Sequence, residues 1–259
     1  MEIFEAVILG LVQGLTEFFP VSSTAHLILF PWFFGWGGEL DTLSFDVALH
    51  GGTLFALVAY FRKDWTNLLL KDRKMLMLVM VGTIPGGIAG VLLQKWVEHA
   101  LRSPLIIVVT LVGVGFIMLA AEKRGERNRA TGGDITLKDA VVIGCAQAVA
   151  LIPGVSRSGI TITAGLFNGF TRETATRFSF LLSTPIIAGA TLLHAAKMVK
   201  HHESLDVSLV GAGFIAAAVS GFFAIGFLMD YLRKHPLHNF VYYRFALAAV
   251  VLIAWLFHR

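Results

Sequence analysis

The chain has 259 residues, of which 56% are hydrophobic and 15% are charged. Ordinary soluble domains carry about 25% charged residues, so this composition excludes the common soluble classes. The formal net charge is +4 at pH 7, and in so apolar a chain the placement of basic residues is more informative than their sum. The opening MEIFEAVILG has acidic residues where a cleaved signal peptide needs basic ones, and the single cysteine excludes an intramolecular disulfide framework.

In chain order, the sequence starts with residues 1–31, an apolar segment interrupted by the polar stretch PVSSTAH. A second interrupted segment, residues 139–170, carries PGVSRSGIT near its middle. Six further apolar runs lie at residues 47–61, 75–94, 103–121, 178–196, 207–229 and 245–257. A hydrocarbon core of about 30 Å needs roughly 20 helical residues. We therefore predict an all-α fold, a polytopic membrane helical bundle that forms a single integral membrane domain over residues 1–259.

The basic residues predict the orientation of these helices. Four polar segments hold 14 of the 21 Lys and Arg residues, and these segments are residues 62–74, 122–138, 171–177 and 232–239. Because Lys and Arg concentrate in cytoplasmic loops, we place these segments inside and both chain termini outside. Residues 1–31 and 139–170 must then each enter the membrane and turn back. The prediction is two re-entrant helix hairpins that dip in from opposite faces.

The two interrupted segments also resemble each other in sequence. Matching residues recur at an offset of 134, and they are Gly10, Gln13, Val21 and Ser22 in the first segment and Gly144, Gln147, Val155 and Ser156 in the second. With opposite orientations, this match predicts inverted-topology repeats, a plan typical of proteins whose sites lie at the repeat interface. We predict halves at about 1–121 and 137–259, joined by a cytoplasmic loop at 122–136.

The first segment contains a carboxylate at membrane depth. Gln13 and Glu17 are four residues apart, so they share one face of a helix. A membrane-buried carboxylate usually faces a cavity or a partner. Glu17 is therefore a candidate ligand for a divalent cation, with the Gln13 carbonyl as a neutral second ligand. The alternative is a structural ion pair between Glu17 and Arg157.

Hydroxyl groups and an imidazole follow Pro20. If a helix restarts there, Ser23 and His26 lie on one face, and a hydroxyl beside an imidazole is the simplest activated nucleophile. His26 is alternatively the nucleophile or the general acid, and the spacing does not choose between these roles. A serine at this place also serves as a helix cap.

The second segment has the features of an anion-binding site. Gly154 and Gly159 flank Ser156, Arg157 and Ser158, so backbone amides, hydroxyls and a guanidinium come together at a helix start. The stretch lacks the Gly-Lys pair of a P-loop, which argues against nucleotide binding. Taken with the first segment, it predicts metal-assisted hydrolysis of a lipid phosphate ester or anhydride. The competing hypothesis is a lipid-phosphate transporter, or flippase, that uses the same midplane site.

Two long motifs, QGLTEFFPVSSTAH and PGVSRSGIT, resemble the signatures of the bacterial undecaprenyl-pyrophosphate phosphatases, the bacitracin-resistance family. The resemblance implies hydrolysis of undecaprenyl pyrophosphate to undecaprenyl phosphate and inorganic phosphate, which recycles the carrier lipid of peptidoglycan synthesis. It implies dependence on Mg²⁺ or Ca²⁺, and a multi-pass protein of the bacterial cytoplasmic (inner) membrane whose active site opens to the outer face. The expected partners are the polyprenyl pyrophosphate and membrane lipid, with a possible homodimer and no nucleic acid.

The resemblance also assigns roles to residues. Glu17 matches the essential acid, and the serine–histidine group matches Ser22, Ser23 and His26. The phosphate-binding set matches Gly154, Ser156, Arg157, Ser158 and Thr161. Gln13 stands where the family often has glutamate, and His50 stands where we expect glutamine, without an assigned role. We predict Ser23 as the nucleophile and His26 as its base.

Overall fold

The computed structural model describes residues 2–101, 103–128, 134–201 and 206–257, and in these ranges the regular structure is entirely helical. The elements in chain order are α1 (Glu2–Phe18), α2 (Ser23–Phe34), the 3-10 turn η1 (Gly38–Asp41), α3 (Leu43–Tyr60), α4 (Arg62–Leu70), α5 (Arg73–Ala100), α6 (Pro104–Asn128), α7 (Leu137–Val149), α8 (Arg157–Phe167), α9 (Arg172–His201), α10 (Val207–Lys234) and α11 (His238–Phe257). Six of them, α3, α5, α6, α9, α10 and α11, are long and apolar enough to cross a membrane. The predicted polytopic helical bundle is confirmed, and each of the six predicted runs matches one of these helices, four lying wholly inside it and two, 47–61 and 103–121, extending one residue beyond it.

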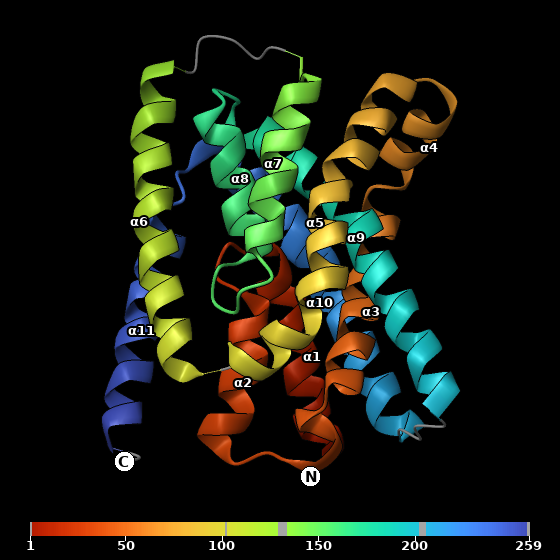
Figure 1. Cartoon of the computed structure of the whole chain (residues 1–259), viewed down its shortest axis with the longest axis vertical. Coiled ribbons are helices and arrows are strands. Elements are labelled where there is room, and N and C mark those ends of the chain that lie inside the picture. The colour runs from red at the N-terminus through yellow and green to blue at the C-terminus, as the bar shows by residue number, and fades with distance from the viewer. Residues whose placement is uncertain (1, 102, 129–133, 202–205, 258–259) are drawn as a thin grey trace.

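The two interrupted segments form helix hairpins, α1–α2 and α7–α8. Figure 1 shows that they enter the bundle from opposite ends and that their turns meet near its middle. Each turn contains a serine in the left-handed region, Ser22 with φ 77° and Ser156 with φ 72°. Each serine caps the helix that follows, Ser22 Oγ accepting from Ala25 N and Ser156 Oγ from Gly159 N. The two hairpins thus share the same turn conformation and the same serine cap, and the inverted-topology repeat stays a prediction.

Small residues let the hairpin helices pack closely on long helices. α1 packs along α10, where a Cβ added at Gly14 would lie 1.9 Å from Ser220 Oγ. α7 packs along α5, where a Cβ at Gly144 would lie 2.2 Å from the carbonyl oxygen of Gly82. Small residues of α5 and α10 therefore let the two hairpins approach these helices closely.

The four segments predicted to share the inside lie together at one end of the bundle. Ion pairs join them across the chain, and these pairs are Arg177–Asp64, Arg233–Glu173 and Arg172–Glu122. Figure 1 shows α1 beginning and α11 ending at the opposite end. The structure therefore separates the basic end from the end that carries the first and last helical residues, as the charge distribution predicts.

Candidate active site

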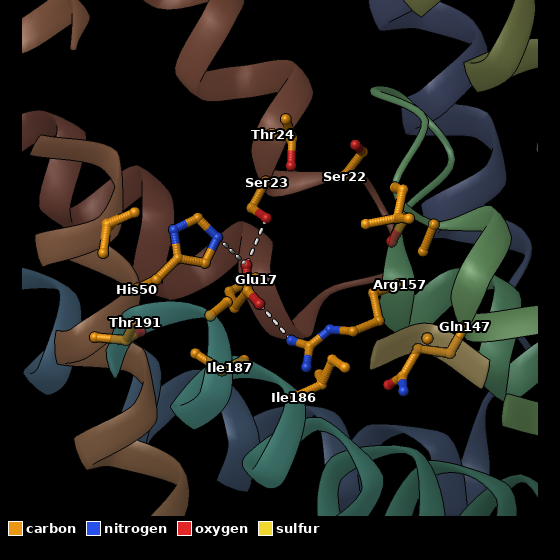
Figure 2. Close-up of a pocket in the computed structure, with 16 residues that line it drawn as sticks. Glu17, Ser22, Ser23, Thr24, His50, Gln147, Arg157, Ile186, Ile187 and Thr191 are labelled. Carbon is orange, nitrogen blue, oxygen red and sulfur yellow. Dashed lines mark hydrogen bonds and ion pairs between the residues drawn. The ribbon is translucent and has the colours of Figure 1, made fainter. Parts of the chain in front are cut away.

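A cavity of about 240 Å³ lies where the turns of the two hairpins meet (Figure 2). Both hairpins contribute residues to its wall, together with α3, α5 and α9. The polar lining residues are Glu17, Ser22, Ser23, Thr24, His50, Gln147, Ser156, Arg157 and Thr191. The cavity therefore brings one carboxylate, several hydroxyls and one guanidinium to the middle of the bundle.

Glu17, near the end of α1, is the centre of this cluster. One oxygen of its carboxylate accepts a hydrogen bond from Nη2 of Arg157. The other, Oε2, accepts from Ser23 Oγ at 2.5 Å and from Gln13 Nε2 at 3.1 Å, and lies 3.6 Å from Nε2 of His50. A buried carboxylate is stable only with such partners. The structure thus forms the Glu17–Arg157 ion pair that the sequence offers as an alternative to a metal site.

Ser23 is placed by the turn before it. α1 ends at Phe18, Ser22 in the left-handed region is the N-cap of α2, and Ser23 is the first residue of α2. Its hydroxyl lines the cavity and donates to Glu17. A short hydrogen bond from a hydroxyl to a carboxylate is of the strong, charge-assisted kind. It directs the Ser23 hydroxyl proton at the Glu17 carboxylate.

His26 is bound elsewhere, although the helix does restart at Ser23. Its Nδ1 lies 2.7 Å from the carbonyl oxygen of Ser22, so Nδ1 carries a proton and donates it. Its Nε2 then accepts from the hydroxyl of Tyr243 at 2.7 Å, and the two rings stack. The expected Ser23–His26 pair is not formed, because Glu17 takes the Ser23 hydroxyl and both ring nitrogens have other partners. His26 is also outside the cavity lining.

Two of the predicted phosphate-binding residues join the hairpins to each other instead of lining the cavity. The Gly154 amide donates to Ser22 Oγ at 3.2 Å, and Ser158 Oγ donates to the Phe19 carbonyl at 3.1 Å. Gly154 also needs to be glycine, because its φ is 89° and a Cβ would lie 2.0 Å from a Thr110 side-chain oxygen. These contacts fix the position of one turn against the other.

Of the remaining predicted phosphate-binding residues, Thr161 joins two helices, and Ser156 and Arg157 line the cavity. Thr161 Oγ1 donates to the Arg157 carbonyl at 2.7 Å and lies 2.6 Å from Ser179 Oγ, which ties α8 to α9. Ser156 and Arg157 line the cavity. Of the second motif, these two are therefore in position to meet a ligand.

The structure adds residues to the site that the sequence leaves without a role. His50 of α3 faces Glu17, and Thr191 of α9 lines the same side of the cavity (Figure 2). Arg244 of α11, fully buried, donates to the carbonyls of Pro20 at 3.2 Å and Gly154 at 2.8 Å, one in each turn. An arginine at membrane depth is the one sequence signal that points to such a contact.

Residues of α3 and α9 also line the cavity, and several of them are apolar. Val47 and His50 come from the first half of α3, and Ile186, Ile187 and Thr191 come from the later part of α9. These parts lie toward the end of the bundle where α1 begins (Figure 1). The polar cluster at the middle of the bundle therefore adjoins apolar lining from α3 and α9.

Comparison with known proteins identifies relatives of this chain. The model of the family described as "Bacitracin resistance protein BacA" matches residues 6–250. A protein of Thermodesulfovibrio yellowstonii named undecaprenyl-diphosphatase is 57% identical over 258 residues, which cover 100% of this chain and 99% of that protein. A protein of Moorella thermoacetica with the same name is 48% identical, with 99% of each chain covered. One of Elusimicrobium minutum, also so named, is 45% identical over 96% of each chain.

Proposed function

The chain belongs to the bacitracin resistance protein family, and we propose that it is a membrane phosphatase that hydrolyses undecaprenyl pyrophosphate to undecaprenyl phosphate and inorganic phosphate. The observation that carries this proposal is the contact of Ser23 and Arg157 with the same buried carboxylate, that of Glu17, inside a cavity. A nucleophile, a proton acceptor and a cation for phosphate charge are the groups that phosphoryl transfer needs.

In the proposed reaction the Ser23 oxygen bonds to the terminal phosphorus of the substrate. The bond from that phosphorus to the bridging oxygen breaks, and the bridging oxygen leaves with its electron pair as part of the lipid phosphate. The Ser23 proton passes to Glu17 along the 2.5 Å hydrogen bond. The oxygen of a water molecule then bonds to the phosphorus of the phosphoserine, the bond from that phosphorus to the Ser23 oxygen breaks, and the Ser23 oxygen takes back the proton from Glu17 as inorganic phosphate is released. Arg157 offsets the charge on the transferred group.

His26 has a positioning role in this scheme. Its Nδ1 donates to the carbonyl of Ser22, the residue directly before the nucleophile. The Tyr243 hydroxyl donates to Nε2 and so fixes the orientation of the imidazole. The geometry supports Glu17 as the proton acceptor of Ser23, in place of the imidazole that the sequence favours.

The predicted Mg²⁺ or Ca²⁺ is compatible with the residues present. Among the described residues there is no cluster of three or more His, Cys, Asp or Glu side chains that could hold a metal alone. Mg²⁺, however, is commonly held by one or two carboxylates together with substrate phosphates. Glu17 would be the carboxylate, and Gln13 has a buried Oε1 without a hydrogen-bond partner. A bound cation would neutralise charge on the pyrophosphate.

The surroundings of the cavity fit a lipid substrate taken from the outer side of a bacterial cytoplasmic membrane. The polar cluster adjoins aliphatic side chains such as Leu151, Ile186 and Ile187, which would contact the first isoprene units. The parts of α3 and α9 that line the cavity lie toward the end opposite the basic segments (Figure 1). By the positive-inside rule that end faces outward.

The test is phosphate release from undecaprenyl pyrophosphate by the purified protein in detergent, with Mg²⁺ and with chelator. Ser23→Ala should lower the rate by about 10²–10⁴-fold, the range for loss of a proton-transfer pair. Thr24→Ala is the matched control, because Thr24 is exposed and lines the same cavity. Equal rates for the two variants would contradict the role of Ser23. No release by folded wild-type protein, with labelled lipid crossing sealed vesicles, would instead favour the transporter.

A further inference from the structure

Gln147, on α7, is a polar residue of the cavity that the proposed chemistry does not use. It is 3% exposed and lines the cavity, yet neither its Nε2 nor its Oε1 has a hydrogen-bond partner among the described residues. Nη1 of Arg157 is buried and likewise without a partner. Buried polar groups in folded proteins are almost always hydrogen-bonded. Two unpartnered donor groups beside one cavity therefore indicate a ligand.

The backbone of α5 makes room for the Gln147 amide. A Cβ added at Gly86 would lie 3.0 Å from Nε2 and 3.4 Å from Cγ of Gln147, so any side chain at that position would press on the amide. Gly86 itself lines the cavity. Gly86 thus leaves space for the amide at the cavity, and no described residue is hydrogen-bonded to that amide.

Two of the unpartnered donors in the cavity lining, those of Gln147 and Arg157, lie on the same side of Glu17, whereas the third, Thr191 Oγ1, lies on the other side. Figure 2 shows Arg157 between Glu17 and Gln147, with His50 and Thr191 on the opposite side of Glu17. Nη2 of Arg157 is bound to Glu17, so Nη1 is the donor left for a second group. An amide N–H and a guanidinium N–H together suit an anionic oxygen.

We propose that Gln147 and Nη1 of Arg157 form a second phosphate subsite, which holds the lipid-linked phosphate while the terminal phosphate lies at Ser23. This inference rests on the proposed phosphatase function and specifies how its substrate is oriented. We place the lipid-linked phosphate on the Gln147 side, where Ala150 and Leu151, which follow Gln147 in the chain, supply apolar lining for the first part of the tail. After the bridging bond breaks, the same donors hold the departing lipid phosphate.

The experiment measures inhibition and binding by three probes, which are farnesyl methylenediphosphonate, farnesyl phosphate and inorganic phosphate. Gln147→Leu should weaken binding of both farnesyl compounds about tenfold, the effect of one lost hydrogen bond to a charged group. It should leave inhibition by inorganic phosphate unchanged, because that product lies at Ser23. The KM for undecaprenyl pyrophosphate should rise more than kcat falls. Gly86→Ala, which displaces the amide without removing it, should weaken the farnesyl compounds in the same selective way.

The outcomes separate this inference from the proposed function. Equal weakening of all three probes, or no weakening of any, would overturn the subsite, since a merely structural amide has no reason to select lipid-linked phosphate. Wild-type protein that binds the diphosphonate through Gln147 but releases no phosphate would refute the phosphatase and leave the subsite standing. Phosphate release by the wild type, together with unchanged probe binding in Gln147→Leu and Gly86→Ala, would refute the subsite and leave the phosphatase function standing.

Discussion

The ion pair between Glu17 and Arg157 allows the stability and the activity of the site to be separated by experiment. Both side chains are largely buried, with 5% of the Glu17 side chain and 14% of the Arg157 side chain exposed. Arg157→Met leaves the carboxylate without its cation, and breaking a buried pair on one side costs about 3–5 kcal/mol of unfolding free energy. The same change removes the cation that faces the transferred phosphate. Loss of one such stabilising donor lowers kcat by about 10²–10³-fold.

The double variant Glu17→Gln/Arg157→Met removes both charges and leaves a neutral amide that still accepts from Ser23. Replacing a whole buried ion pair is often close to neutral for stability. We therefore expect thermal unfolding in detergent to occur at a temperature about 10 °C lower for the single variant, and near the wild-type temperature for the double variant. Phosphate release from undecaprenyl pyrophosphate should stay lost in both.

Two results would refute this reasoning. If Arg157→Met unfolds at the wild-type temperature, the carboxylate does not depend on the guanidinium in the folded protein. If the double variant recovers phosphate release along with its stability, then the two residues serve only the fold and the chemistry lies elsewhere. Glu17→Gln alone completes the cycle and measures the coupling between the two positions.

Arg244→Met should lower the unfolding free energy by about 2–6 kcal/mol, because it leaves a buried carbonyl in each hairpin turn without its donor, at about 1–3 kcal/mol each. Thermal unfolding measures this loss, and a variant as stable as wild type would contradict the role of Arg244 in holding the two turns. Gly144→Ala should cost about 1–3 kcal/mol by forcing α7 from α5, whereas Gly113→Ala, with nothing within 4 Å of its added Cβ, should unfold like wild type. In a background without the native cysteine, a membrane-impermeant thiol reagent added outside intact cells should label Gly37→Cys and not Lys71→Cys; the opposite pattern would reverse the proposed orientation.

The six membrane-spanning helices and the grouping of the basic segments could be predicted from the sequence. Both follow from local composition, since an apolar run of sufficient length crosses a bilayer as a helix and basic residues collect on one side. The two hairpins follow as well, because Pro20 and Pro153 interrupt runs whose flanking charges require a return to the same side. The family was also recognisable from its two motifs.

The partners of individual side chains required the tertiary structure. The Ser23–His26 pair expected from helical spacing is not formed, because the left-handed φ of Ser22 turns its carbonyl to the imidazole and Glu17 takes the Ser23 hydroxyl. Spacing along one helix carries no information about a contact between residues 140 apart, such as that of Glu17 with Arg157.

His50, Gln147 and Arg244 belong to the site region for the same reason. His50 lies on α3 and Arg244 on α11, two helices remote in sequence from both motifs, and tertiary packing brings them to Glu17 and to the two turns. Gln147 lies on α7, where packing against Gly86 of α5 sets the direction of its side chain. The sequence by itself determined which segments enter the membrane and which polar residues lie at membrane depth. How those residues are paired was decided by the close packing of the two hairpins, which only the tertiary structure contains.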